Sequence, residues 1–324
     1  MKTTTAILAA ALGLALQAIL PAPVLAGEGI RPAGPIGGTD IRQAILPPGP
    51  GLYGVGVGVN GRFPDYLTED GHLDSDGQFI VGGIGLLAVY PFELFGGRLA
   101  SSIFMSGGQT CFRIKPMPDS CSDGMGDPYA DVLMWSRHFP SRTASPAGNP
   151  FLHYGLDTLV GLGLSIPAGV YDRHSPVNNG SNVYDIAPNF ALTYTTPSVL
   201  GPALGDATEF SARVFYNYYT RNDANEYKSG DLISADFAMT QRKGAWQFGL
   251  TGTGFVQIED DEIDGVPVPG GNRAKMLQLG PIVSHDFMAG GRPWNVTVKG
   301  LFYVDGQNAA APNVVVLRIG TKLF

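Results

Sequence analysis

The residues of this 324-residue chain that could bind or react are polar side chains set into segments that alternate between apolar and polar positions. Each lies on the polar parity of its segment, that is, at one of the alternate positions that face away from the apolar side chains. They are Asp131, Arg137, Asp157, Asp185, Asn189, Arg213, Asp236, Gln247, Gln257, Asn295 and Lys299. Enclosed charges must be paired or hydrated, because an unpaired buried charge costs several kcal/mol. We therefore expect either a structural network of ion pairs or a polar track that orients a bound molecule.

Two groups of residues suggest metal binding, but neither has the required spacing. The acidic run 259–265 places Asp260, Glu262 and Asp264 near the first ligand positions of an EF-hand loop. The twelfth position, which needs a bidentate Glu, is Gly271. A solvated loop that divalent ions could bridge to lipopolysaccharide is expected instead. The histidines show neither an HExxH pattern nor close metal spacing; they are His72, His138, His153, His174 and His285. No metal site and no cofactor are expected.

Catalytic motifs are also missing from the sequence. His174 and Ser175 are neighbours in an expected outer loop, which leaves a lipid-acting serine hydrolase as an alternative. No Gly-x-Ser-x-Gly elbow accompanies them. The glycine-rich segments 54–58 and 82–85 have no following helix to supply a phosphate site, and we expect them to bend strands or leave space. The chain is not expected to be an enzyme.

The elements that must position these residues are β-strands, because most of the chain alternates with a period of two. Phe248 and Leu250, for example, fall on one face while Gln247 and Thr251 fall on the other. About 12 strands of roughly 11–15 residues are expected, long enough to cross a bilayer at a tilt, whereas a soluble sandwich usually has shorter ones. They lie near 52–60, 78–90, 97–107, 127–139, 152–166, 182–196, 207–220, 230–242, 245–258, 273–288, 292–304 and 312–324.

The connections between these strands favour a transmembrane barrel. Short turns are expected at 243–244 and 289–291, with 140–151 as an exception on the same side. Long outer loops and short periplasmic turns are typical of bacterial barrels, and an even strand count puts both termini in the periplasm. The chain ends in Phe324, a terminal aromatic of the kind such barrels carry, although it falls off the apolar parity of the last strand. Longer connections are expected at 61–77, 108–126, 167–181, 221–229, 259–272 and 305–311.

The N-terminal part of the chain predicts export. Residues 1–26 have a positive start at Lys2, an apolar centre and small residues before a cleavage point, as in a secretory signal. Residues 27–51 are rich in Gly and Pro and predict an irregular leader, periplasmic or lumenal, ahead of a barrel at 52–324. No other apolar run approaches the roughly 18 residues of a transmembrane helix, which excludes a helical membrane protein.

Composition and charge agree with a membrane-exposed surface. Charged residues make up 15% of the chain and 45 residues are Gly, so a surface other than a water-covered one is indicated. The net charge of −7 removes any electrostatic reason to bind nucleic acid. The cysteines, Cys111 and Cys121, are close together in an exported chain, so a local disulfide is expected rather than two free thiols.

The chain resembles the meta-pathway phenol-degradation (MetA-pathway) family of bacterial outer-membrane transporters over essentially its whole mature length. The segments that carry the resemblance are 37–56, 124–135, 178–194, 227–240, 270–281 and the terminal strand. None of them is a catalytic motif, and the family supplies no active-site residues to carry over. The resemblance implies a barrel in the outer membrane of a Gram-negative bacterium and uptake of small hydrophobic or aromatic compounds.

The expected partners follow from this location. They are outer-membrane lipid and lipopolysaccharide, a small hydrophobic substrate and the barrel-assembly machinery. Two other functions stay open alongside uptake: a lipid-acting outer-membrane enzyme, and a structural or adhesive barrel that works through its extracellular loops, of which 108–126 is the candidate.

Overall fold

The computed structural model describes residues 32, 38–69, 71–145 and 152–324. The expected secretory signal at 1–26 lies outside the described residues, as does most of the leader before residue 38. In the described part of the chain, no helix is long and apolar enough to cross a membrane. Its regular elements are strands, so the predicted all-β fold class is confirmed.

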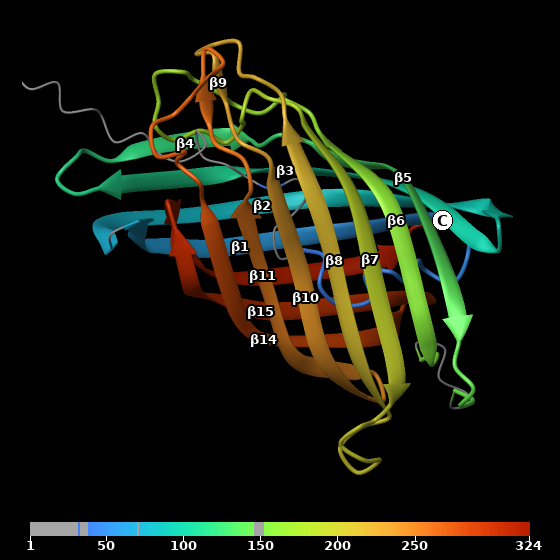
Figure 1. Cartoon of the computed structure of the whole chain (residues 1–324). Helices are drawn as coiled ribbons and strands as arrows, with labels where there is room; N and C mark the ends of the chain where they lie inside the picture. The colour runs from blue at the N-terminus through green and yellow to red at the C-terminus, as the bar shows by residue number, and fades with distance from the viewer. Residues whose placement is uncertain (1–31, 33–37, 70, 146–151) are drawn as a thin grey trace, which may run out of the picture.

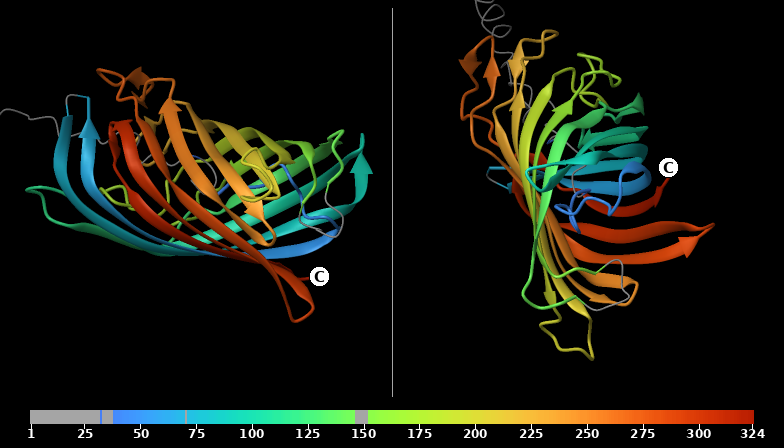
Figure 2. Two further views of the ribbon diagram at one scale, coloured as in Figure 1. Left: turned by 90° about the horizontal axis from the view of Figure 1, so that it is seen from below. Right: turned by 90° about the vertical axis from the view of Figure 1, so that its right-hand side faces the viewer.

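Twelve long strands of the described residues close into an antiparallel barrel (Figures 1 and 2). β1 pairs with both β17 and β2, which closes the sheet and removes the free edges that an open sheet would expose. The predicted barrel of about 12 strands is confirmed. In hydrogen-bonding order the strands are β1 (Gly51–Thr68), β17 (Asn313–Lys322), β15 (Arg292–Gln307), β14 (Lys275–Ala289), β11 (Trp246–Gln257), β10 (Leu232–Lys243), β8 (Ala207–Tyr219), β7 (Asp185–Pro197), β6 (Gly155–Ser165), β5 (Tyr129–Pro140), β3 (Gly97–Ile114) and β2 (Gly71–Leu94).

Three strands extend further than their sequences predict. The long connection predicted at 61–77 is wrong, because β1 continues to Thr68 and β2 begins at Gly71. Much of the connection predicted at 108–126 is also strand, since β3 continues to Ile114 and pairs with β4 (Ser120–Met125). Where a strand extends beyond the membrane, both of its faces contact water, so apolar and polar residues need not alternate. The extended parts of these strands therefore have the composition of loops.

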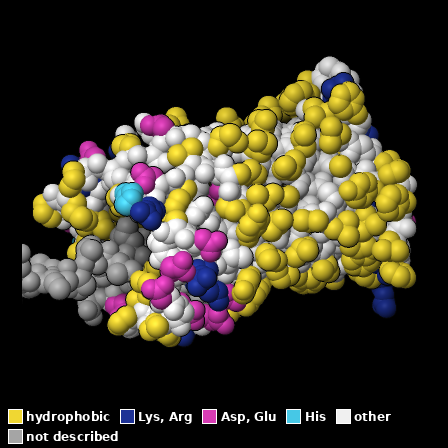
Figure 3. Space-filling model, turned by 90° about the horizontal axis from the view of Figure 1, so that it is seen from above, with side chains coloured by type: hydrophobic (Ala, Val, Ile, Leu, Met, Phe, Trp, Pro, Cys, Tyr) yellow, Lys and Arg dark blue, Asp and Glu magenta, His cyan; other side chains and the backbone are white. Residues whose placement is uncertain are grey.

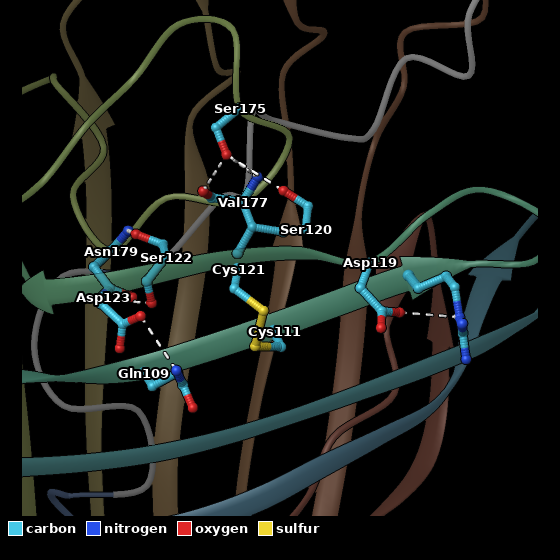
Figure 4. Close-up of a disulfide and its surroundings, with 11 residues drawn as sticks. Gln109, Cys111, Asp119, Ser120, Cys121, Ser122, Asp123, Ser175, Val177 and Asn179 are labelled. Carbon is cyan, nitrogen blue, oxygen red and sulfur yellow. Dashed lines mark hydrogen bonds and ion pairs between the residues drawn. A yellow bond between two sulfur atoms is a disulfide. The ribbon is translucent and has the colours of Figure 1, made fainter.

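The β3–β4 extension is closed by a disulfide between Cys111 and Cys121, which face each other in the ladder (Figure 4). A second contact ties the connection between β6 and β7 to the same place. The backbone N–H of Asn179 donates to Ser122 Oγ at 3.1 Å. Its side-chain amide donates to the carbonyl of Gly108 at 2.9 Å. The extension and the connection therefore form one structured cap at this end of the barrel.

The two ends of the barrel differ in the length of their connections. At one end, β2–β3, β10–β11 and β14–β15 are joined by the two-residue turns 95–96, 244–245 and 290–291. The opposite end carries the connections 166–184 and 220–231, and a further one at 258–274. β9 (Tyr227–Lys228), β12 (Glu262–Ile263) and β13 (Val266–Pro267) form a small separate sheet there, and β16 (Ala309–Ala310) pairs with β1 (Figure 1). In bacterial outer-membrane barrels the short turns face the periplasm. Two connections at the short-turn end, 141–154 and 198–206, are longer.

The outer wall of the barrel is apolar. Figure 3 shows hydrophobic side chains spread over the strands and charged side chains gathered toward one end of the molecule. Ile84 of β2 is 71% exposed, and Leu250 of β11 is 67% exposed. A continuous apolar surface of this kind needs lipid around it, and a closed antiparallel barrel is how outer-membrane proteins satisfy their backbone hydrogen bonds there. The chain is an outer-membrane barrel.

Candidate functional site

A cavity of about 1230 Å³ lies inside the barrel. Its walls are the inner faces of the strands together with leader residues between Gly38 and Pro48. One side of the cavity is apolar and is formed by β1, β2 and β3. The other side is polar and includes Asp131, Arg213 and Lys299. A molecule inside the barrel would therefore meet two chemically different surfaces.

The apolar wall consists of valine and phenylalanine side chains that point into the cavity. In β1 this reverses the usual polarity of the barrel, because the small or polar residues Gly58 and Asn60 are exposed outside. The ring of Phe63 stacks at a tilt on Phe79, with centroids 4.9 Å apart. Hydrophobic and aromatic linings of this kind favour apolar ligands. The apolar wall is Val55, Val57, Val59, Phe63, Phe79, Val81, Phe104 and Phe112.

Glycines in β2 create the space that these rings occupy. A Cβ on Gly83 would lie 2.3 Å from Cζ of Phe104, and a Cβ on Gly85 would lie 2.8 Å from Cγ1 of Val55. Both contacts are far below van der Waals distance, so the absence of a side chain at these positions is required for the observed packing. The glycine-rich segment 82–85 thus shapes the apolar wall and leaves space for its aromatic rings.

Three of the predicted lumenal residues meet on the polar side. Arg213 of β8 donates to Asp131 of β5 at 2.6 Å and to the amide oxygen of Asn189 of β7 at 2.8 Å. The hydroxyl of Tyr129 donates to the same carboxylate at 2.8 Å. The side chains of Arg213 and Asp131 are 5% and 6% exposed. This arrangement satisfies a buried ion pair and locks three strands together.

Replacing Arg213 with Met is expected to lower the free energy of unfolding by about 3–5 kcal/mol, because the carboxylate of Asp131 then loses its buried partner. Urea unfolding of the barrel in lipid vesicles measures this. The double variant Asp131→Leu/Arg213→Met removes both charges and is expected to recover most of the loss. A double variant no more stable than Arg213→Met would contradict this account of the pair.

The leader supplies the partner of another predicted lumenal residue. Asp40 is fully buried and forms an ion pair with Lys299 of β15, while Arg318 of β17 lies 3.8 Å from its other oxygen. Burial raises the pKa of the Asp40 carboxyl, but Lys299 and Arg318 more than offset this, so the pKa lies below its ordinary value of 3.8. Asp40 is therefore held as a carboxylate inside the barrel.

A second ionic cluster centres on Asp286 of β14. Arg42 of the leader lies 3.1 Å from this carboxylate, and Arg242 of β10 lies 2.9 Å from it. Gln247 accepts hydrogen bonds from both guanidinium groups, at 3.2 Å and 2.7 Å. Asn295 donates to Asp286 at 2.7 Å. The predicted residues Gln247 and Asn295 thus help to hold the leader against the wall.

Apolar packing and backbone hydrogen bonds complete the leader's attachment. Ala44 and Leu46 are buried in a cluster with Met134 and Leu159 of the inner wall. The N–H of Ala44 donates to Thr193 Oγ1 at 3.1 Å. The backbone N–H groups of Arg42 and Gln43 also bond to wall side chains, at 3.0 Å to Glu209 and 3.2 Å to Ser211. The described leader is therefore bound inside the lumen along its length.

The other predicted residues on the polar parity are dispersed along the lumen. The carboxylate of Asp236 accepts hydrogen bonds from leader residue Thr39 at 2.6 Å and from Thr253 at 2.5 Å. Gln257 donates to the carboxylate of Asp261 at 2.8 Å. Asp185 is buried at the start of β7. Asp157 lies at the short-turn end beside two histidines. These residues do not form one compact site.

The prediction that Arg137 faces the lumen is wrong. Asp131 pairs with Gly163 of β6, but Leu133 pairs with Leu162, so Val132 is an extra residue in a β-bulge. After the bulge the inward parity changes by one position. Arg137 is exposed, and its guanidinium carbon lies 4.8 Å from the centroid of the Phe139 ring.

The acidic run 259–265 is only partly the solvated loop that its sequence predicts. Asp261 is fully buried and accepts hydrogen bonds from the Tyr227 hydroxyl at 2.5 Å and from the Gly230 N–H at 2.8 Å. Asp260 forms an exposed ion pair with Arg273 at 2.6 Å. The run therefore stabilises the small β9–β12–β13 sheet through Asp261.

The His174–Ser175 pair also has a structural explanation. The Ser175 hydroxyl donates to the carbonyl of Val177 at 2.7 Å, which closes a local turn. Nε2 of His174 lies 3.1 Å from Nε of Arg173. In this arrangement the histidine is directed to its other neighbour in the chain and not to the serine hydroxyl.

Several residues at the interior were missed by the sequence analysis. Asp40 and Arg42 are charged residues within an otherwise Gly- and Pro-rich leader, and that isolation is a usable signal. Asp286 and Arg242 occupy the polar parity of their strands and could have been found by extending the alternation. What the sequence does not show is that leader and wall charges pair with one another, because their partners are far apart along the chain.

Comparison with known proteins identifies relatives of this architecture. No curated protein is similar in sequence to the chain. An outer-membrane channel from Pseudomonas putida F1 superposes with a TM-score of 0.68 at 15% identity, covering 86% of this chain and 97% of that one. The β domain of the Bordetella autotransporter BrkA gives a TM-score of 0.47 at 11% identity, with 85% and 100% covered. The first likeness shows a shared fold.

The sequence also matches a family model over residues 65–319, which is most of the barrel. The matched region includes β2 to β16 in full, half of the residues of the apolar wall, and Asp131, Arg213 and Lys299 of the polar side. The chain belongs to the family described as "Putative MetA-pathway of phenol degradation".

Proposed function

We propose that this protein is an outer-membrane channel that takes up small hydrophobic or aromatic compounds. The observation that carries the proposal is the apolar wall of β1–β3 inside the cavity. The interior of an outer-membrane barrel is usually polar, so this lining is unusual. A water-filled general pore has a polar interior. An apolar wall opposite a polar network suits a molecule that is mostly hydrophobic with a small polar group.

The position of the leader supports selective uptake over general diffusion. Asp40 and Arg42 bind to the wall by ion pairs, and Ala44 and Leu46 are buried against it. A segment held in this way obstructs the lumen to hydrated solutes. The apolar wall on the opposite side of the cavity remains lined by valine and phenylalanine. We infer that the channel conducts ions poorly and that its substrates contact the apolar wall.

The proposal includes the partners of an outer-membrane barrel. The exposed apolar side chains of the outer wall would contact lipid. The polar extensions of β1 to β3 would contact lipopolysaccharide. Phe324 is 82% exposed at the end of the chain, where the barrel-assembly machinery could recognise it. The chain would act without catalysis, since the Ser175 hydroxyl is engaged in a local turn.

Uptake by cells tests the proposed function directly. The gene is deleted in its bacterial host, and entry of a radiolabelled monoaromatic compound is compared with entry of a small hydrophilic sugar. Deletion is expected to slow aromatic uptake several-fold and to leave sugar uptake unchanged. Restoring the gene on a plasmid should restore uptake. Unchanged aromatic uptake at limiting concentration, or an equal loss for both solutes, would contradict the proposal.

A further inference from the structure

Two histidines and one aspartate meet at the short-turn end of the barrel. His138 is near the end of β5, His153 is near the end of the following connection, and Asp157 is in β6. His138 Nδ1 lies 3.0 Å from Asp157 Oδ1, and His153 Nε2 lies 3.5 Å from Asp157 Oδ2. One ligand atom from each residue can be chosen so that the three lie within 4.8 Å of one another. His138 and Asp157, 19 positions apart along the chain, are directly opposite each other in the β5–β6 ladder.

The carboxylate of Asp157 is the second observation that points to a ligand. Its side chain is 4% exposed, and its Oδ2 atom has no hydrogen-bond partner in the described residues. A buried carboxylate oxygen without a hydrogen bond costs free energy, because water no longer solvates it. This oxygen is directed at His153, whose side chain is 39% exposed. The cluster is therefore open to solvent on the histidine side, and one of its two carboxylate oxygens has no hydrogen bond in the described residues.

The backbone around the cluster makes room for the imidazole rings. A Cβ on Gly155 would lie 2.7 Å from Cε1 of His138, so a larger residue there would displace the ring. The His138 and His153 rings pack edge to face, with centroids 4.8 Å apart. The rings are therefore held close to each other by packing, and His138 is held to the carboxylate by a hydrogen bond.

From this geometry we propose that His138, His153 and Asp157 form a site for a divalent transition metal ion, with Zn²⁺ as the best match. Zinc binds imidazole nitrogen and carboxylate oxygen at about 2.0–2.2 Å in a tetrahedron, which separates ligand atoms by about 3.4 Å. His138 lies 3.0 Å from Oδ1 of Asp157 and His153 lies 3.5 Å from Oδ2, so each histidine nitrogen faces one carboxylate oxygen at close to this distance. Small rotations of the exposed histidines would complete the site, with water as a fourth ligand.

A bound ion would join three elements at the periplasmic end. It would link the end of β5, the residues just before β6 and the start of β6, where His153 lines a small pocket with leader residues Arg42 and Ile45. Leu152 and Tyr154 on either side of His153 are buried with Ala207 of β8, so the position of this histidine is coupled to the wall. The site is separate from the apolar wall, and the proposal stands independently of the uptake function.

The cluster also has a competing explanation, in which a protonated histidine simply pairs with Asp157. That pairing needs no metal, and zinc would then bind no more tightly than to any exposed histidine. A second group, Asp65, His72 and Asp74, also brings possible ligands together, but on the outer extension of β1 and β2. It provides an internal control for adventitious binding.

Zinc titration of the folded barrel distinguishes these possibilities. The full chain is purified in detergent with a tag that contains no histidine, treated with a chelator, and titrated with Zn²⁺ by isothermal calorimetry. Wild-type protein is expected to bind one tightly held ion. His138→Ala, His153→Ala and Asp157→Asn are each expected to weaken it about 100-fold, since loss of even an outer partner of a metal ligand costs 10–100-fold. His72→Ala should bind as wild type does.

The remaining outcomes overturn the proposal. They are no saturable binding to wild type, unchanged affinity in the His138→Ala/His153→Ala double variant, or loss of binding in His72→Ala. Folding of each variant is checked by its heat-dependent gel migration. If Asp157→Asn fails to fold, His153→Ala still provides the test, because the His153 side chain is 39% exposed. Visible absorption of the Co²⁺ form, present in wild type and lost in His153→Ala, would give an independent reading of the ligand set.

Discussion

Replacing Asp40 with Ala is expected to release the leader from the lumen, raising single-channel conductance in planar bilayers several-fold. The reason is electrostatic. Asp40 is the buried partner of Lys299 and is also close to Arg318. Without the carboxylate, Lys299 is left buried and unpaired, which costs about 3–5 kcal/mol unless the segment moves and water enters. When the leader moves away, water can hydrate Lys299, which removes this cost. The variant therefore favours an open lumen with a higher conductance.

The control for this prediction is an ion pair of the same chemistry on the surface. Lys275 and Asp305 are 3.2 Å apart, with side chains 44% and 61% exposed. An exposed pair contributes about 0–1 kcal/mol, so Asp305→Ala should change neither conductance nor stability appreciably. Asp40→Asn, which keeps the shape but not the charge, is expected to have an intermediate effect. Conductance unchanged from wild type in Asp40→Ala would mean that apolar packing alone retains the leader.

Replacing Val59 with Asn is expected to weaken binding of a monoaromatic compound about tenfold or more. The side chain of Val59 faces the cavity in the middle of the apolar wall, opposite Val81 of β2. An amide placed there must lose hydration when an apolar ligand covers it, at a cost of about 1–3 kcal/mol. Displacement of a fluorescent hydrophobic probe from the purified barrel measures the affinity.

The matched control is the adjacent residue of the same strand. Gly58 is exposed on the outside, and a Cβ there would meet nothing within 4 Å. Gly58→Asn adds the same amide to the opposite face, next to the naturally outward Asn60, and should leave the affinity near that of wild type. Equal losses of affinity in Val59→Asn and Gly58→Asn would indicate that the ligand binds outside the cavity. Unchanged affinity in both variants would show that the apolar wall is not part of the binding site.

Periodicity was sufficient to predict the barrel because every membrane-crossing strand must present one face to lipid. The same parity places Asp131, Asn189 and Arg213 on the inside, where the structure brings them together. Prediction was less successful where that constraint ends. Outside the membrane, β1 to β3 continue with polar composition. In β1 the valines face inward, and an alternation with a period of two does not by itself show which face of a strand contacts lipid.

Pairing between distant parts of the chain is the second limit. Lys299 is readily assigned to the interior, but its partner Asp40 is 259 positions away. The leader has no periodicity from which its path could be predicted, since its structure is set by contacts with the wall. Similarly, His138, His153 and Asp157 have no metal-binding spacing in the sequence, and their proximity depends on the register of β5 against β6.

The bulge at Val132 has a consequence for how such a barrel can change during evolution. One additional codon in β5 decides that His138 faces Asp157 and that Arg137 faces outward. Deleting that codon would exchange the two surfaces of the rest of the strand without altering a single residue downstream or the number of strands. Insertions and deletions within a strand, more than substitutions, can therefore give a barrel of this kind a new interior in one step.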